Sequence, residues 1–383
     1  MKDELTEEQI DIKKAAREFA IGEFPGVAKE ADVNEEFPKD LFKKACGNGF
    51  IGVYIGEQYG GAGLGLFEHA LILEEFWRVD PGCGNILLSA TGSQLIQLYG
   101  TEEQKKRFLP PLPRGEAMMG IPCYSEYEFR GDLLKIGMSA KKDQDNSFSI
   151  HGNKALVING TLADHLILTC LTNPESDLTD DRYSNFIVST RDDRIRKKTL
   201  KNKLGVRATD FADIGLNNVR VPQEGLIGKE DKGFEQIDHF LDWLKVCCAA
   251  QGLGVSQGAL DQSIKYARTR VQFSVPIGRF DAIQSKIADM ATKIESARWL
   301  SYRAARKMDH GEEDKKLISM AKWYTAQICL EVTAEAIQIH GGYGFIKDLD
   351  VERFYRDAQF LSFVSGRKYF EKKAIAENLL GKC

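Results

Sequence analysis

The sequence lacks long apolar runs, and no stretch reaches the roughly 18 consecutive apolar residues that a membrane-spanning helix needs. It also lacks an excess of either charge, because 52 lysines and arginines face 56 aspartates and glutamates, for a formal net charge of -4. The first residues are charged and contain no apolar core of a secretion signal. We therefore expect a cytoplasmic protein with neither a membrane nor nucleic acid among its partners.

Closely paired metal-binding cysteines are absent as well. No two of the eight cysteines have the CxxC spacing of a zinc site or a redox dithiol. Reduced and mostly buried thiols are the simplest interpretation, so we expect no bound metal. The eight are Cys46, Cys83, Cys123, Cys170, Cys247, Cys248, Cys329 and Cys383.

The chain has 383 residues, 43% of them hydrophobic and 28% charged, which is the balance of a folded protein with two or three packed units. Residues 1–115 have helical periodicity and begin with Thr6-Glu7-Glu8-Gln9, the spacing of a capping box. Residues 116–230 contain short alternating runs, such as His165 to Cys170, that predict an antiparallel β domain. Residues 231–383 return to long helical segments, enough for a four-helix bundle. The predicted fold class is α+β, in the order α, β, α.

Two short motifs are candidates for ligand binding. Residues 268–278 end a long helix with two arginines, and an arginine fork there suits a phosphate. A plain helix hairpin with solvated arginines explains the same residues. Residues 338–345 place three glycines in four positions after a helix, where backbone can approach a ligand closely. A simple helix C-cap remains the alternative, because no strand precedes these glycines.

Taken in order, these segments resemble the acyl-CoA dehydrogenase family over nearly the whole chain. Further elements of the resemblance are Gly60 to Leu64 with Glu74-Glu75, Lys203 to Asp210, Val219 to Pro222, and Val351 to Ala358. The resemblance implies a flavoprotein with an N-terminal α-helical domain, a middle β domain and a C-terminal four-helix bundle. The cofactor that it implies is FAD.

The resemblance also implies eight FAD contacts. Three residues reach the FAD of a neighbouring subunit, three cradle its diphosphate and adenosine half, and two lie in the strand that faces the flavin ring. In that order they are Arg270, Gln272 and Phe273; Gln338, Gly341 and Gly342; and Tyr124 and Ser125. A cofactor at a subunit boundary implies a homodimer or homotetramer, and a hetero-oligomer with a homologous subunit stays open.

The substrate side departs from the family. Asp242 and Lys245 match an Asp and Arg pair that holds the CoA part of the substrate, with a point charge in place of the arginine fork. The family's reaction needs a carboxylate that removes the α-proton of an acyl thioester. At the two positions where members carry that glutamate, this chain has Ser365 and Leu244. The catalytic residue is therefore unknown, and the chain resembles a divergent member that lacks the usual glutamate.

Three other carboxylates are candidates for the base, and each has a simpler explanation. Asp242 is explained as a CoA contact, Glu126 as a structural glutamate of the family, and Glu371 as part of a charged helix face. We assign His340, before the glycines, to packing. The family's Trp-Ile-Thr-Asn-Gly segment reads Leu156 to Gly160 here, so the indole that flanks the flavin is missing.

Three functions stay open at this point. The first is a divergent FAD-dependent, acyl-CoA dehydrogenase-like oxidoreductase that acts on an acyl thioester of CoA or of a carrier protein. The second is a flavin-dependent monooxygenase on the same fold, which needs no base for the α-proton. The third is a non-catalytic subunit that completes the FAD site of a hetero-oligomeric dehydrogenase with Arg270 and the Gly341-Gly342 turn.

Overall fold

The computed structural model describes residues 5–122, 137–178, 181–365 and 368–381. The N-terminal domain is helical, as the periodicity predicts. Its helices are α1 (Glu7–Glu23), α2 (Ala28–Asn34), α3 (Lys39–Gly47), α4 (Leu66–Val79), α5 (Pro81–Gly84), α6 (Ser93–Tyr99) and α7 (Glu102–Phe108). The predicted capping box is confirmed, because Thr6 Oγ1 accepts the Gln9 N–H and Gln9 Oε1 accepts the Thr6 N–H.

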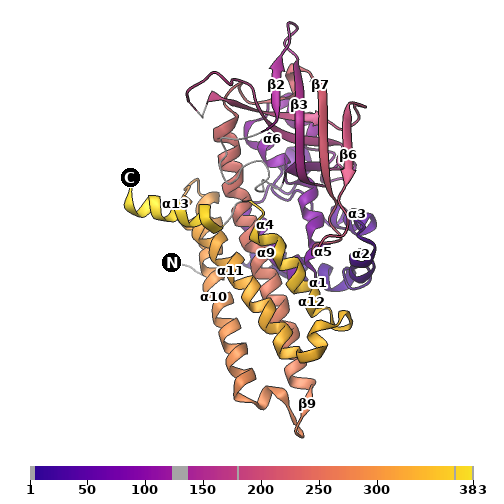
Figure 1. Cartoon of the computed structure of the whole chain (residues 1–383), viewed down its shortest axis with the longest axis vertical. Helices are drawn as coiled ribbons and strands as arrows, with labels where there is room; N and C mark the ends of the chain where they lie inside the picture. The colour runs from indigo at the N-terminus through magenta and orange to yellow at the C-terminus, as the bar shows by residue number, and fades with distance from the viewer. Residues whose placement is uncertain (1–4, 123–136, 179–180, 366–367, 382–383) are drawn as a thin grey trace.

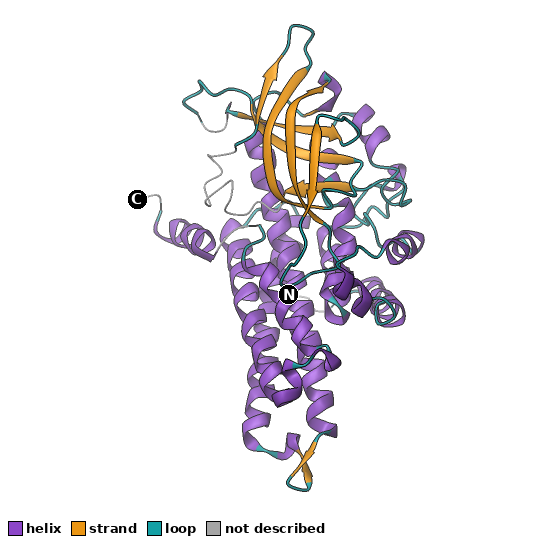
Figure 2. Ribbon diagram, turned by 45° about the vertical axis from the view of Figure 1, so that its right-hand side comes forward, coloured by secondary structure: helices purple, strands orange, loops and turns teal. Residues whose placement is uncertain are grey.

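The middle domain is one twisted β-sheet with helices beneath it (Figure 2). Its strands are β1 (Met119–Pro122), β2 (Ser139–Lys142), β3 (Phe148–Ile158), β4 (His165–Leu171), β5 (Tyr183–Ser189), β6 (Ile195–Thr199), β7 (Phe211–Val221) and β8 (Leu226–Ile227). Their order is β6-β7-β3-β1-β4-β5-β8, and β2 pairs with both β3 and β4. Most pairs are antiparallel, as predicted. β1 and β2 differ, because each lies between β3 and β4 and runs parallel to β4.

The C-terminal domain contains three long helices side by side (Figure 1). Its elements are α9 (Gly233–Thr269), the hairpin β9 (Val271–Gln272) and β10 (Val275–Pro276), α10 (Asp281–Asp309), α11 (Lys315–His340), α12 (Val351–Ala358) and α13 (Lys368–Leu380). α12 packs against α9 and α11. The last predicted helical segment, Phe370 to Leu380, forms α13, which contacts α11 but projects to the side of the bundle in Figure 1.

Helix α9 joins the bundle to the N-terminal domain. It crosses α4 so closely that a Cβ added at Gly258 would lie 2.2 Å from the Arg78 carbonyl oxygen, and one at Gly254 would lie 2.3 Å from that of Glu74. Because the two backbones touch, the side chains of α9 have fixed positions relative to α4. Side chains of all three domains share one hydrophobic core. No helix in the described ranges is both long enough and apolar enough to cross a bilayer.

Candidate functional site

A narrow pocket lies where the three domains meet, and the surface of its wall is apolar. Residues 85–90 contribute one side, strands β1 and β3 a second, helix α9 a third and the segment after α12 the fourth. The lining residues are Leu88, Ile121, Pro122, Ile158, Leu244, Cys247, Cys248, Gln251, Phe360, Val364 and Ser365. The pocket encloses about 20 Å³, and its wall suits an uncharged hydrocarbon group, which leaves no polar atom unpaired there.

Both positions where the family carries its glutamate face this pocket. Leu244 and Ser365 are buried in its wall, and Ser365 has a backbone φ of +56°. That left-handed conformation costs a residue with a Cβ roughly 1 to 2 kcal/mol. Backbone strain of this kind concentrates at functional sites, where surrounding structure holds the residue in place. The Ser365 hydroxyl lies 3.6 Å from the Cys248 thiol, which donates to it.

Charged side chains are buried behind the pocket wall. Asp242, Lys245 and Cys248 are spaced at three-residue intervals and so lie along one face of α9. Lys245 Nζ is 2.9 Å from Asp242 Oδ1 and 3.8 Å from Glu371 Oε2, and both carboxylates are almost completely buried. Burial lowers the pKa of Lys245, but Glu371 and Asp242 outweigh it and raise that pKa overall. None of the described residues that line the pocket is a carboxylate.

Asp242 and Glu371, the candidate bases among the described residues, do not line the pocket. Asp242 and Glu371 are engaged with Lys245, although Asp242 Oδ2 accepts no hydrogen bond from a described residue. Glu126 lies outside the described residues, as do Tyr124 and Ser125. The sequence analysis missed Cys248 and Lys322, a fully buried lysine on α11 whose charge acts on that thiol. The spacing of Cys248 from Asp242 and Lys245 was the available signal.

A second pocket of about 480 Å³ lies at the far end of α9. It brings together four residues that the resemblance assigns to FAD: Arg270, Gln272, Gly341 and Gly342. An added Cβ at either glycine would meet no atom within 4 Å, so the turn leaves room for a ligand against its backbone. In the part of the chain that the structure describes, Arg270 forms no ion pair and lies 5.5 Å from the centre of the Tyr343 ring.

Two more of the eight assigned residues, Gln338 and Phe273, adjoin lining residues along the chain and do not line this pocket themselves. Gln338 is exposed on α11, and its carbonyl accepts the Gly341 N–H. Phe273 is 89% exposed at the tip of the β9–β10 hairpin. His340 packs as predicted, with its ring stacked on Tyr266 and its Nδ1 2.7 Å from the Ala336 carbonyl oxygen. Burial lowers the pKa of His340.

The two pockets are far apart on the same helix. Arg270 follows Cys248 by 22 residues, which is about 33 Å along α9 at 1.5 Å per residue. The residues around Arg270 and those around Ser365 therefore line two separate pockets of one chain.

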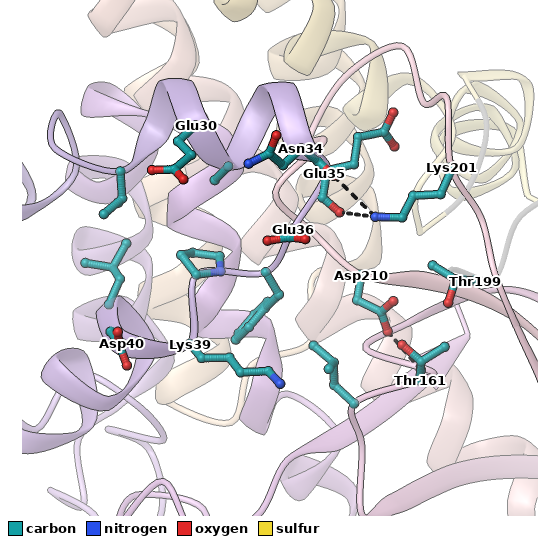
Figure 3. Close-up of a pocket in the computed structure, with 16 residues that line it drawn as sticks. Glu30, Asn34, Glu35, Glu36, Lys39, Asp40, Thr161, Thr199, Lys201 and Asp210 are labelled. Atoms are coloured by element: carbon teal, nitrogen blue, oxygen red, sulfur yellow. Dashed lines mark hydrogen bonds between the residues drawn. The ribbon is translucent and has the colours of Figure 1, made fainter.

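A groove of about 650 Å³ lies between α2, α3 and the β domain (Figure 3). Three of the charged side chains that line it, Glu35, Lys201 and Asp210, are bonded within the protein. Lys201 Nζ is 2.7 Å from the Glu35 carbonyl oxygen, and the Glu35 carboxylate is paired with Lys203 and Arg207. Asp210 accepts the backbone N–H of Thr161. The bonds of Glu35 tie the helical domain to the segment between β6 and β7.

Models of the acyl-CoA dehydrogenase N-terminal, middle and C-terminal domains match residues 6–116, 123–219 and 231–380. The chain is 36% identical to a 3-(aryl)acrylate reductase from Clostridium sporogenes, over 98% of this chain and 99% of that protein. It is 34% identical to the caffeyl-CoA reductase-Etf complex subunit CarC from Acetobacterium woodii, over 99% and 100%. The structure of butyryl-CoA dehydrogenase from Megasphaera elsdenii superimposes with a TM-score of 0.93, at 29% identity over 99% and 100% of the two chains.

Proposed function

Because the chain belongs to the acyl-CoA dehydrogenase family, we propose that it is an FAD-dependent oxidoreductase acting on the Cα–Cβ bond of an acyl thioester. The observation that carries this proposal is the apolar pocket at the junction of the three domains, with Ser365 at its wall. The apolar wall suits the hydrocarbon part of an acyl group, and a strained residue beside it is typical of a reaction site. CoA and an acyl carrier protein are both possible carriers.

We propose that Arg270, Gln272, Phe273, Gln338, Gly341 and Gly342 hold the adenosine and diphosphate half of a neighbouring subunit's FAD, and that Tyr124 and Ser125 hold the flavin half in their own subunit. The guanidinium suits a diphosphate, since its planar fork donates to two oxygens at once. The open turn at Gly341 and Gly342 lets the backbone approach a ligand closely. When bound, FAD supplies a two-electron hydride acceptor or donor.

We propose that Lys245 and Asp242 bind the carrier part of the substrate. The Lys245 side chain keeps 18% of its surface exposed, while that of Asp242 keeps 2%. The lysine is therefore the group that meets a phosphate of the carrier, and the aspartate orients it through their 2.9 Å contact.

The test is the visible spectrum of the purified protein and its response to thioesters without oxygen. We expect one FAD per chain and a change of the flavin spectrum on adding a saturated or a 2-unsaturated acyl-CoA. Arg270→Ala should lower the FAD content. The matched control is Arg279→Ala, an exposed arginine nearby on the chain, which should leave the FAD content unchanged. A protein that carries FAD but responds to no thioester would refute the proposed function.

A specific observation supports a second candidate, a subunit that only completes the FAD site of a homologous partner. That observation is the lack of a carboxylate among the described residues lining the pocket. The protein would then be colourless alone and become coloured on co-expression with the partner. A monooxygenase would instead form an oxygen adduct after reduction by an added reductant.

A further inference from the structure

The Cys248 and Ser365 side chains meet at the pocket wall although 117 positions separate them. We propose that Ser365, backed by Cys248, donates the proton that the α-carbon of a 2-enoyl thioester needs, so that this pocket is built to reduce a double bond. This inference rests on the proposed function and names its substrate class. Ser365 is then the catalytic residue, and Cys248 supplies the proton that Ser365 passes on.

The contact has the correct polarity for a donor chain. The Cys248 thiol donates to Ser365 Oγ across 3.6 Å, which leaves the serine hydroxyl hydrogen free to point elsewhere. Both residues line the pocket, so a ligand inside it is the neighbour within reach. The left-handed backbone of Ser365 holds its side chain at this wall.

The buried charges behind the wall complete the chain. Burial raises the pKa of the Cys248 thiol, against the opposing effects of Lys322 and of the bond to Ser365, so the thiol is protonated at neutral pH. Burial also lowers the pKa of Lys322, which makes its ammonium a better acid. The charge of Lys322, on the helix α11 that packs against α9, therefore stabilises a thiolate formed at Cys248, and we propose that this lysine returns the proton.

The step balances as follows. The β-carbon of the enoyl thioester receives a hydride, for which the reduced flavin of the proposed function is the source. The π electrons of the double bond move to the α-carbon and form a C–H bond with the proton of Ser365. Ser365 takes the Cys248 proton, and the thiolate takes one from Lys322, which solvent later reprotonates. The product is the saturated thioester.

The redox partner of the flavin sets the net direction, because a catalyst accelerates a reaction and its reverse equally. The donor sets the protonation state that a substrate meets. Oxidation of a saturated thioester begins when an anion removes the α-proton, and a carboxylate is such an anion at neutral pH. A serine hydroxyl and a protonated thiol instead hold the proton that reduction consumes, so the resting pocket matches a 2-enoyl thioester that meets reduced flavin.

The first test follows exchange of the α-proton in D₂O by NMR, on the FAD-loaded protein with a bound 3-thia-acyl-CoA, which the flavin does not oxidise. We expect no detectable exchange in the wild type and clear exchange in Ser365→Glu, because the substitution adds an anionic base. Exchange in the wild type as fast as in Ser365→Glu would overturn the inference.

The second test measures reoxidation of the reduced flavin by a 2-enoyl-CoA. Ser365→Ala and Cys248→Ala should each slow it by about 10²- to 10⁴-fold, the usual contribution of a positioned acid. Cys248→Ser should retain more of the rate than Cys248→Ala, since a hydroxyl still donates. Cys46→Ala, a buried thiol in α3, is the control that should keep the wild-type rate.

FAD content and thermal midpoint show that each variant is folded before its rate is read. Wild-type rates in Ser365→Ala and Cys248→Ala would overturn the inference while leaving the proposed function intact. Failure of the wild type to bind FAD, or to exchange electrons with any thioester, would instead refute the proposed function.

Discussion

His69 on α4 is a fully buried imidazole that stacks on Trp243 of α9 with 5.4 Å between ring centres. Burial lowers the pKa of His69 to about 3. The unfolded chain takes up a proton near the ordinary pKa of about 6.5, whereas the folded chain does not. His69 therefore stabilises the fold fully above pH 6.5, and that contribution is lost as the pH falls from 6.5 towards 3.

His69→Phe keeps an aromatic ring and removes this titration. Relative to the wild type, its free energy of unfolding should increase by about 1.4 kcal/mol for each pH unit below 6, so the variant becomes the more stable of the two. Thermal midpoints measured between pH 8 and 5 check this. His151→Gln, at an exposed position on β3, is the control. A difference between His69→Phe and the wild type that stays constant over this range would show the prediction to be wrong.

Single residues differ in how far the sequence predicts them. The absence of glutamate at Ser365 and Leu244 is visible in the order of motifs, and both side chains face the pocket. The contact of Cys248 with Ser365 is not visible, because it depends on how the segment after α12 folds back onto α9. The positive φ of Ser365 is equally hidden, since serine carries no preference for that conformation.

At the level of elements, the crossing of α9 over α4 depends on glycine. Gly258→Ala would place a Cβ 2.2 Å from the Arg78 carbonyl oxygen, which does not move without separating the helices. We expect a loss of about 2 kcal/mol or more in stability, measured as a lower denaturation midpoint. Gly22→Ala in α1 is the matched control, because its Cβ meets nothing within 4 Å. It should leave stability unchanged or raise it by about 0.5 to 1 kcal/mol.

Equal midpoints for Gly258→Ala and Gly22→Ala would contradict the close crossing.

The sequence predicts the long helices well because their periodicity extends over many turns. It does not predict β6, since Ile195 to Thr199 contains one buried apolar residue and is held by pairing with β7. The parallel pairing of β1 with β4 is also missing from the pattern, because alternation reports burial and not strand direction.

At the scale of the whole molecule, the end of the bundle farthest from the sheet carries exposed apolar side chains around the β9–β10 hairpin (Figure 1). Phe273 is 89% exposed and Phe345 is 87% exposed. Large apolar groups exposed together are typical of a surface that a partner covers. We propose that this end contacts another subunit in a homodimer or homotetramer, or a homologous chain in a hetero-oligomer.

Phe273→Asp should therefore lower the molecular mass in solution, as measured by light scattering on a sizing column, and lower the FAD content with it. The reason is that the aspartate charge would be buried against the partner without a bond to compensate it. Val33→Asp, an exposed apolar residue on α2, is the control and should keep the wild-type mass. An unchanged mass and FAD content in Phe273→Asp would rule out this surface.

The order of the three domains was predictable, because the hydrophobic pattern of the sequence changes twice, from helical periodicity to short alternating runs and back. The pocket was not, since its lining comes from five separate stretches that meet only after the domains pack. Local patterns describe each domain by itself, while the junction depends on contacts such as that of α9 with α4.

The most direct test of the account mixes the protein anaerobically, with its flavin reduced, with a 2-enoyl-CoA at neutral pH and follows the flavin absorbance. The account predicts that the absorbance of oxidised flavin returns as the thioester becomes saturated. Flavin that stays reduced with every enoyl thioester, in a protein that readily oxidises saturated ones, would contradict it.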